Sequence, residues 1–245
     1  MSLSIILTCY NEVPLIFESY ERIVSMMKLT RIDCEYLVVD DGSTPDNKKE
    51  LASYFQKKQN TKLLFSDVNE GRGAAVTKGI KAGSKEFVCF IDTDLEIPPN
   101  EIFNFYLAMA SGSAAADIII GKRVYLLGGN IYEYFRAMNS KIYSFLVNMI
   151  FGLNSLDTES GIKIFRTNKI LPILDKVEDK RWFWDTEVIL QSIKHKLRVT
   201  QKPVLVIRKT DKPSSVHFFR DTYRYLSAIY RYSKKQGKNV SYSNS

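Results

Sequence analysis

The segment Phe87-Val88-Cys89-Phe90-Ile91-Asp92-Thr93-Asp94-Leu95-Glu96 joins a short apolar run to three carboxylates. The aromatic and β-branched residues of its first half, 87–91, predict a buried strand. The Asp-x-Asp pair follows directly, so two carboxylates would emerge where that strand ends. Because Asp-x-Asp is also common in solvated turns, the surrounding sequence has to decide whether the pair marks a site.

Short apolar runs alternate with longer amphipathic stretches before this segment. The pattern predicts strands at residues 3–7, 35–39 and 62–65, and helices at residues 14–28, 46–58 and 72–82. Repeated strand–helix units predict a mostly parallel, Rossmann-like sheet flanked by helices, with a site at the carboxyl ends of the strands. The predicted fold class is therefore α/β.

The pattern changes after residue 116. Strands are predicted at 117–121 and 162–166, helices at 131–151 and 185–196, and an extended segment at 197–208. No Gly-, Pro- or Ser-rich linker separates the two halves, so we expect a single domain over residues 1–215. Residues 216–236 have the pattern of a basic amphipathic helix, and the polar residues 237–245 are expected to form a disordered tail.

The composition is that of an ordinary globular protein, since 45% hydrophobic and 25% charged residues exclude a disordered or fibrous chain. Cys9, Cys34 and Cys89 lie in or beside apolar runs without metal-ligand spacing, so we expect reduced core thiols. No apolar stretch is long enough for a membrane span or a leader, which favours a cytoplasmic chain. The net charge of +8 favours nucleotides or anionic lipid as partners, or is a solvated surface charge. We expect no nucleic acid partner.

Three polar turns follow three of the predicted strands. They comprise residues 8–12, 40–43 and 92–96. The carboxyl ends of parallel strands meet at one edge of a sheet, so the acidic side chains of these turns would converge. Converging carboxylates repel one another unless a cation compensates. Oxygen ligands select hard cations such as Mg²⁺ or Mn²⁺, which keep open positions for phosphate oxygens.

A glycine-containing turn, Asn69-Glu70-Gly71-Arg72-Gly73, opens the helix predicted at 72–82. Small residues allow close approach of the backbone, and Arg72 offers a guanidinium fork to a phosphate at the start of a helix. A plain helix start with packing glycines is the alternative. The spacing matches neither a Walker A loop nor a dinucleotide fingerprint, so neither an ATPase nor a dehydrogenase is supported.

Taken in order, these motifs resemble glycosyltransferase family 2, whose members have the GT-A fold. The matching stretches are Thr8-Cys9-Tyr10-Asn11-Glu12, Val38-Val39-Asp40-Asp41-Gly42-Ser43, Asn69-Glu70-Gly71-Arg72-Gly73, Gly79-Ile80 and Asp92-Thr93-Asp94. The resemblance implies that residues 1–122 bind a UDP- or GDP-sugar through Thr8, Tyr10, Asn11, Glu12, Asp40, Asp41, Gly71, Arg72, Asp92, Thr93 and Asp94. It also implies Mg²⁺ or Mn²⁺ at Asp92, Asp94 and Glu96, with the two aspartates as catalytic residues.

Residues 123–215 form the expected acceptor half. Gly121-Lys122-Arg123, then Arg136 and Ser140 one helical turn apart, and Asp157-Thr158-Glu159-Ser160-Gly161-Ile162-Lys163 resemble the polyprenyl-phosphate branch of the family, the dolichyl-phosphate mannose and glucose synthases. The resemblance implies that Arg123, Arg136 and Ser140 hold the acceptor phosphate, while Arg208 meets phosphate oxygens of the donor. The implied reaction is the inverting transfer of a hexose to a polyprenyl phosphate, such as dolichyl or undecaprenyl phosphate.

Two other functions stay open. A hydroxyl of a glycan or lipid-linked oligosaccharide could be the acceptor, and Asp185 would then be the catalytic base, since a carboxylate within hydrogen-bond reach can take the proton. Asp185 would serve equally well as the N-cap of the helix predicted there. The second alternative is a non-catalytic nucleotide-sugar-binding subunit, which the intact Asp92, Asp94 and Arg72 disfavour.

The helix predicted at 216–236 carries an apolar stripe beside a basic one. The apolar stripe comprises Phe219, Tyr223, Leu226 and Tyr230, and the basic stripe comprises Arg220, Arg224, Arg231 and Lys235. Such a helix can rest peripherally on the cytoplasmic face of an anionic membrane, or pack on the core with a solvated basic edge. The helix predicted at 131–151 also has an apolar face, which could meet lipid or a second copy in a homodimer.

Overall fold

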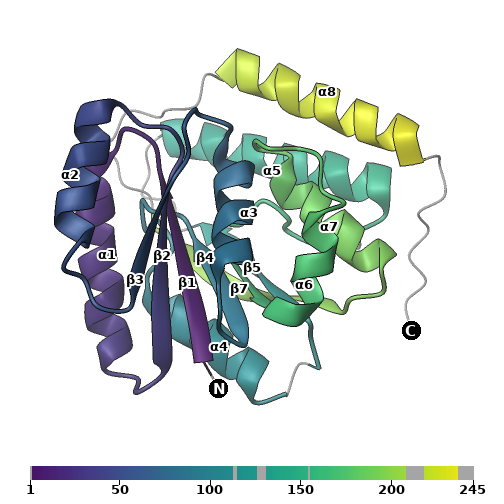
Figure 1. Cartoon of the computed structure of the whole chain (residues 1–245). Helices are drawn as coiled ribbons and strands as arrows, with labels where there is room; N and C mark the ends of the chain where they lie inside the picture. Colours follow the sequence, from purple (N-terminus) through teal and green to yellow (C-terminus); the bar gives the residue numbers. More distant parts are fainter. Residues whose placement is uncertain (1, 113–114, 126–130, 154, 208–217, 237–245) are drawn as a thin grey trace.

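Seven strands form one sheet within the part of the chain that the structure describes, residues 2–112, 115–125, 131–153, 155–207 and 218–236 (Figure 1). The structure is a computed structural model, and it describes only the backbone of residues 131–137, 139, 218–223 and 236. The strands are β1 (Ser2–Cys9), β2 (Asp33–Asp40), β3 (Thr61–Phe65), β4 (Phe87–Ile91), β5 (Ile118–Tyr125), β6 (Ile162–Arg166) and β7 (Val199–Val206). Their order in the sheet is β3-β2-β1-β4-β6-β5-β7.

The sheet is mostly parallel, as the sequence predicts. Neighbouring strands are parallel except at β6, which runs antiparallel to β4 and β5. Ile5 in the middle of β1 is paired with Tyr36 of β2 and Cys89 of β4. The strands that carry the three polar turns are therefore neighbours in the order β2-β1-β4, with their carboxyl ends at one edge.

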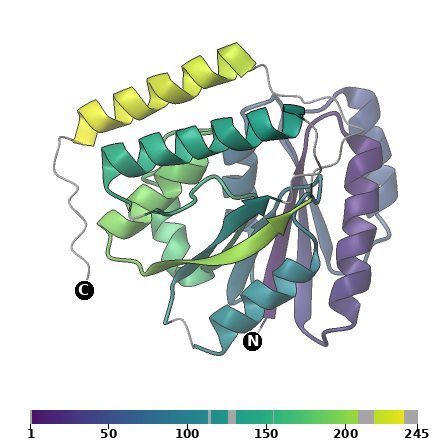
Figure 2. The same ribbon diagram turned by 180° about the vertical axis from the view of Figure 1, so that it is seen from behind.

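Helices cover both faces of this sheet (Figures 1 and 2). The helices are α1 (Val13–Lys28), α2 (Pro45–Phe55), α3 (Arg72–Ala82), α4 (Asn100–Ala110), α5 (Ile131–Phe151), α6 (Thr167–Leu174), α7 (Trp184–Lys194) and α8 (Phe218–Gln236). Ile5 belongs to the buried cluster with Ile16 of α1, whereas Ile6 belongs to the cluster with Val76 of α3. Because successive strand residues point to opposite faces, both faces of the sheet are buried.

A third buried cluster joins α5, α7 and α8. It includes Val147 of α5, Phe183 at the start of α7 and Tyr225 of α8. The rings of Phe183 and Tyr225 pack edge to face with their centroids 5.7 Å apart. α8 therefore packs on the rest of the protein, side by side with α5 (Figure 2).

The face of α8 that packs on the core is not the apolar stripe named in the sequence, so the alternative in which Leu226 and Tyr230 pack on the core is wrong. Leu226 and Tyr230 of that stripe are exposed, and the side chains of Phe219 and Tyr223 lie outside the described residues. The residues of α8 that are buried instead are Tyr225, Ala228, Ile229 and Tyr232. Aromatic and apolar residues surround this helix on more than one side, so its periodicity alone permits two packing faces.

Most predicted elements are confirmed to within a few residues, but the sequence pattern does not predict α4 or α6. α6 is only eight residues long and contains Pro172, which weakens a helical pattern. The expected boundary after residue 122 falls inside β5, so the two proposed halves share a strand. The three cysteines are free and buried, as expected. Among the described residues, no helix is long and apolar enough to cross a bilayer, and the predicted tail 237–245 lies outside them.

The reversed direction of β6 brings its first residues to the carboxyl edge of β4. The backbone amide of Asp92 donates a hydrogen bond to the carbonyl of Gly161, at 2.8 Å. A β-carbon at position 161 would overlap the carboxylate of Asp92, so only glycine fits beside it. The motif at 157–163 therefore meets the Asp-x-Asp turn directly.

Lys163 is a fully buried cation in the middle of β6. Its ammonium group donates hydrogen bonds to the carbonyl of Ser160 at 2.8 Å and to Oδ1 of Asp185 at 2.5 Å. A buried lysine is tolerated only when it is paired and hydrogen-bonded. Lys163 thus connects the central sheet to the start of α7.

Replacing Lys163 with methionine should destabilise the fold by about 3 kcal/mol, because Asp185 would lose a buried partner. The measurement is the free energy of unfolding from urea denaturation. Lys81→Met is the matched control, since Lys81 pairs with Asp175 at the surface, 2.6 Å away. An exposed pair contributes only about 0–1 kcal/mol. Equal losses in the two variants would contradict the stabilising role of the buried contact.

Candidate functional site

The three polar turns meet at the carboxyl edge of the sheet. The backbone amide of Asp41 donates to the carbonyl of Cys9 at 2.9 Å. The hydroxyl of Thr93 donates to the carbonyl of Thr8 at 2.6 Å. Because these contacts join the turn after β1 to those after β2 and β4, the predicted convergence of the turns is present in the structure.

Two of the predicted donor-site residues hold these turns in shape. The backbone amide of Asn11 donates to the hydroxyl of Ser43 at 2.8 Å, and the side-chain oxygen of Asn11 accepts from the amide of Thr44 at 2.9 Å. Asp40 is fully buried and accepts from the amide of Ser43 at 3.1 Å. Asn11 has a positive φ of 54°, a conformation that asparagine tolerates better than most residues. Asn11 and Asp40 therefore link the first two turns.

Asp41 joins the second turn to the glycine-containing turn before α3. Its carboxylate accepts backbone hydrogen bonds from Glu70 at 3.0 Å and from Gly71 at 2.9 Å. Burial raises the pKa of Asp41, although the two backbone hydrogen bonds oppose the shift. Gly71 has a φ of 116° and lies against Arg181, so a side chain at position 71 would be strained and would clash.

A cavity of about 570 Å³ opens beside these turns. It is lined by Thr8, Cys9, Tyr10, Glu12, Asp41, Asn69, Gly71, Arg72, Ala75, Asp179, Arg181, Trp182, Phe183, Arg224, Tyr225, Ala228 and Arg231. Six predicted donor-site residues are among them, namely Thr8, Tyr10, Glu12, Asp41, Gly71 and Arg72. Asn11, Asp40, Asp92, Thr93 and Asp94 lie outside this lining. The first turn and the glycine-containing turn therefore line the same cavity.

Arg72 connects the cavity wall to a chain of paired charges that is buried at one end and partly exposed at the other. Its Nε and Nη2 atoms donate to Oδ1 of Asp92, at 3.0 and 2.8 Å, and its Nη1 atom donates to Oδ2 of Asp185. The guanidinium lies over the ring of Phe90, 4.6 Å from its centroid. With the contact of Lys163 to Asp185, the order of charges is Lys163, Asp185, Arg72 and Asp92. Alternating signs allow these four charged groups, two of them buried, to lie next to one another.

Asp185 lies at the centre of this chain and is 3% exposed. Burial alone would raise its pKa, but Arg72 and Lys163 outweigh burial and hold the pKa below its ordinary value. Each of its oxygens accepts a hydrogen bond from a cation. The neighbouring residue Phe183 is the N-cap of α7, so Asp185 is not the cap. A proton-accepting role for Asp185 stays a prediction, and this geometry does not favour it.

The predicted metal ligands lie in the turn after β4. Asp94 accepts a hydrogen bond from the amide of Glu96 at 3.1 Å, which bends the turn back on itself. Burial raises the pKa of Asp92, and the nearby carboxylate of Asp94 raises it further while Arg72 opposes both. No group of three potential ligands is assembled among the residues that the structure describes, so Glu96 does not complete the predicted set there. Two neighbouring carboxylates nevertheless suit Mg²⁺ or Mn²⁺, which commonly take one or two from the protein and the rest from substrate and water.

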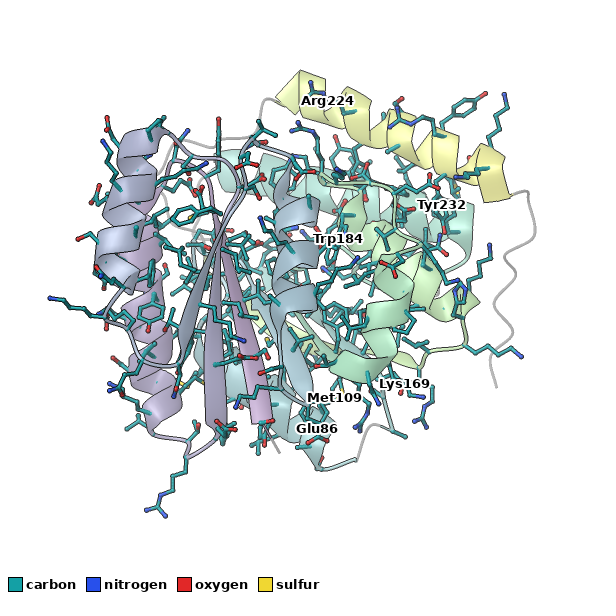
Figure 3. The ribbon with its side chains drawn as sticks, in the orientation of Figure 1. Glu86, Met109, Lys169, Trp184, Arg224 and Tyr232 are labelled. Atoms are coloured by element: carbon teal, nitrogen blue, oxygen red, sulfur yellow. The ribbon has the colours of Figure 1, made fainter. Side chains whose placement is uncertain are left out.

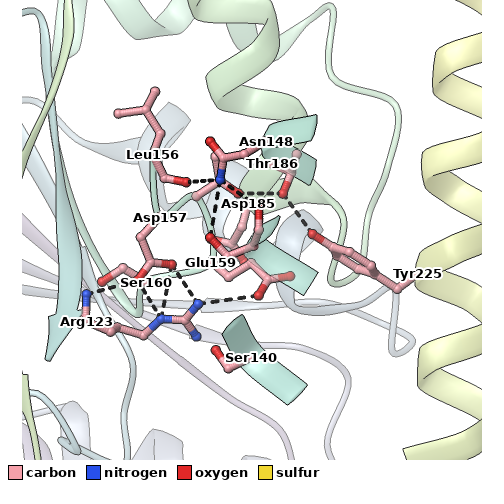
Figure 4. Close-up of polar contacts among 12 residues, drawn as sticks. Arg123, Ser140, Asn148, Leu156, Asp157, Glu159, Ser160, Asp185, Thr186 and Tyr225 are labelled. Carbon is pink, nitrogen blue, oxygen red and sulfur yellow. Dashed lines mark hydrogen bonds and ion pairs between the residues drawn. The ribbon is translucent and has the colours of Figure 1, made fainter. Parts of the chain in front are cut away.

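Arg123, predicted to hold the acceptor phosphate, is bound by carboxylates of the motif at 157–163 (Figure 4). Its Nε donates to Oδ2 of Asp157 at 2.8 Å, and its Nη2 donates to Oδ1 at 2.6 Å. Nη2 also lies 3.4 Å from Oε2 of Glu159. This bidentate arrangement fixes the guanidinium plane.

Ser140 lies on the same side of β5 as Arg123. Arg123 and Tyr125 are two residues apart on β5, so their side chains point to the same face of the sheet. The hydroxyl groups of Tyr125 and Ser140 are hydrogen-bonded at 2.9 Å. The side chain of Arg136 and the whole of Arg208 lie outside the described residues. The structure thus brings together two of the three predicted acceptor-phosphate residues.

Sequence reasoning missed several residues of this region. Arg181 and Trp182 of the cavity lie in the aromatic segment before α7, where they carry no recognisable motif. The role of Lys163 could have been suspected, because a lysine inside the apolar run Ile162–Arg166 needs a buried partner. Arg224 and Arg231 were expected in the basic stripe of α8, but at a membrane surface or a solvated edge and not in the lining of this cavity.

Two relatives are similar to this chain in sequence. The glycosyltransferase AglD of Haloferax volcanii is 26% identical over 209 residues, which cover 83% of this chain and 33% of AglD. A dolichol-phosphate mannosyltransferase of Pyrococcus furiosus is 33% identical over 143 residues, which cover 58% of this chain and 39% of the relative. The chain thus spans less than half the length of either relative.

The fold matches that of a solved enzyme. Glucosyl-3-phosphoglycerate synthase from Mycobacterium tuberculosis, in complex with Mn²⁺, UDP and phosphoglyceric acid, superposes with a TM-score of 0.69 at 15% identity. The match covers 99% of this chain and 80% of that one. The likeness at this identity shows a shared fold, and it agrees with the GT-A fold that the sequence predicts.

The family model described as glycosyl transferase family 2 matches residues 4–171. This range runs from β1 through most of α6 and includes all three polar turns, Arg72, Arg123 and Lys163. It covers more than half of the chain, and the order of motifs within it is the order that the sequence predicts. The chain therefore belongs to glycosyl transferase family 2.

Proposed function

We propose that the chain is a metal-dependent, inverting glycosyltransferase that moves a hexose from a UDP- or GDP-sugar to a polyprenyl phosphate. The observation that carries the proposal is the contact between two motifs at one sheet edge. The carboxylate of Asp92 pairs with Arg72 of the cavity wall, and the backbone amide of Asp92 donates a hydrogen bond to Gly161 of the acceptor motif. Donor and acceptor would thus meet at Asp92, as a direct transfer needs.

The cavity is the proposed donor site. Thr8, Tyr10 and Asp41 would hold the nucleoside, while Asp92 and Asp94 would hold Mg²⁺ or Mn²⁺. The metal ion, when bound, would neutralise the charge that develops on the leaving diphosphate. The mycobacterial synthase of the same fold binds Mn²⁺ and UDP together, which supports this assignment.

The chain of charges would orient the donor site. Arg72 is held on both sides by Asp92 and Asp185, so its guanidinium cannot rotate without breaking hydrogen bonds. Asp185 is in turn fixed by Lys163. We assign Asp185 and Lys163 as positioning residues that keep Asp92 aimed at the metal, because both act on Asp92 through Arg72.

The proposed acceptor is an ionised phosphate rather than a hydroxyl. A phosphate oxygen needs little help from a base, and both oxygens of Asp185 are occupied by cations. Arg123, held by Asp157 near Ser140, would meet the phosphate together with Arg136. The similarity to a dolichol-phosphate mannosyltransferase supports a lipid phosphate.

A peripheral position on the cytoplasmic face of a membrane is part of the proposal. α5 exposes a stripe of apolar side chains at helical spacing, comprising Met138, Ile142, Phe145 and Met149. Leu226 and Tyr230 of the adjacent helix α8 are exposed as well. A patch of this kind on a chain with a net charge of +8 suits an anionic lipid surface.

The direct test supplies polyprenyl phosphate, Mn²⁺ or Mg²⁺, and a panel of labelled UDP- and GDP-sugars, followed by extraction into organic solvent. Label in the lipid phase with one donor is the expected result. Transfer to a glycan hydroxyl alone would show that the acceptor is a hydroxyl and not a lipid phosphate. Absence of transfer from every donor would overturn the proposal.

Asp94→Ala should lower turnover by about 100-fold or more, because the metal contributes several kcal/mol to stabilising the leaving group. The same variant should lose the Mn²⁺-dependent part of UDP or GDP binding, measured by calorimetry. Asp33→Ala is the matched control, since Asp33 is an exposed aspartate at the first residue of β2, opposite the end of the strand that carries the polar turn. If Asp94→Ala kept metal-dependent binding, the metal role of this residue would be wrong.

Phe145→Glu with Met149→Glu should reduce sedimentation with phosphatidylserine vesicles by about tenfold or more, because two apolar anchors would be replaced by charges. These side chains are 65% and 62% exposed, so folding should be unaffected. Leu29→Glu serves as the control, because Leu29 is 85% exposed at the end of α1. Equal sedimentation of the α5 variant and the control would rule out α5 as the membrane-facing helix.

A further inference from the structure

α8 supplies one wall of the proposed donor cavity. Arg224, Tyr225, Ala228 and Arg231 line the same space as Asp41 and the other donor residues. Figure 3 shows Arg224 near the first turns of α8, with Trp184 in the layer below the helix. α8 is far from the donor motifs in sequence, and it lies outside the range 4–171 of the family match.

The packing of α8 determines which side faces the cavity. Tyr225 and Tyr232 are buried in the cluster with α5 and α7, so the helix cannot turn about its axis without exposing them. The hydroxyl of Tyr225 is also hydrogen-bonded to that of Thr186, at 3.0 Å. With this face fixed, Arg224 and Arg231 fall on one side of the helix, because residues seven apart in a helix lie nearly in line.

These two guanidinium groups differ from that of Arg72 in the same cavity lining. Arg72 is engaged by Asp92 and Asp185. In the regions that the structure covers, no carboxylate lies within ion-pair distance of Arg224 or Arg231, whereas Lys235 on the same helix pairs with Glu178. Both arginines are exposed to the cavity side with their donor groups available.

We infer that Arg224 and Arg231 bind the phosphate groups of the nucleotide donor and complete the donor site from α8. The inference rests on the proposed function, since it assigns the ligand of the same cavity. Guanidinium groups match the geometry of phosphate oxygens and bind them with charge-assisted hydrogen bonds. The donor is the phosphate source, because Thr8, Tyr10 and Asp41 of the proposed donor site line this cavity, whereas the acceptor residues Arg123 and Ser140 do not.

The test compares the affinity of the full chain for UDP and GDP with its affinity for uridine and guanosine, by calorimetry with Mn²⁺ present. The double variant Arg224→Ala with Arg231→Ala should bind the diphosphate at least about tenfold more weakly, since the charge-assisted hydrogen bonds of two guanidinium groups would be lost. Its affinity for the nucleoside should be unchanged. Lys234→Ala, which removes an exposed charge from α8 outside the cavity lining, should bind both like the wild type.

Three results would overturn the inference. The first is unchanged diphosphate affinity in the double variant, and the second is an equal loss of nucleoside affinity. The third is loss of sedimentation with phosphatidylserine vesicles at unchanged diphosphate affinity, which would assign the arginines to a lipid surface. A wild-type chain that binds neither UDP nor GDP would overturn the proposed function, and this inference with it.

Discussion

The chain of charges from Lys163 through Asp185 and Arg72 to Asp92 is the constraint on which the site depends. Lys163 and Asp185 are buried and could not occupy their places alone, because an unpaired buried charge costs several kcal/mol. The four residues come from β6, α7, α3 and the turn after β4. Their pairing therefore ties the correct assembly of the sheet and two helices to the formation of the site.

The antiparallel strand β6 is what makes this pairing possible. Running opposite to β4, it presents Gly161 beside Asp92 and places Lys163 two residues further into the sheet. A parallel strand in this place would present the carboxyl end of the strand there instead, and Arg166 rather than Gly161 would lie near the acidic turn. One reversed strand thus brings the acceptor motif to the edge where the donor turns already meet.

The local elements could be predicted because strand and helix periods are visible in a few residues, as in Phe87–Ile91 and Arg72–Ala82. The donor turns could be predicted because parallel strands put their ends at one edge. The direction of β6 could not, since it depends on pairing with β4 and β5, which are far away in sequence. The ion-pair partners of Asp185 could not be predicted for the same reason, because Arg72 lies 113 residues before it in the sequence.

α8 illustrates the limit of periodicity most clearly. Its sequence offers two faces that could be buried, one with Leu226 and Tyr230 and one with Tyr225 and Ile229, and the pattern alone cannot choose between them. The buried face is determined by ring contacts, in which Tyr225 packs on Phe183 and Tyr232 packs on Phe151. That choice leaves Leu226 and Tyr230 outward while Arg224 and Arg231 line the cavity. The rotation of α8 about its axis therefore determines both its outward face and its cavity-lining face. Substitutions at the aromatic contacts of α8 would change these two faces together.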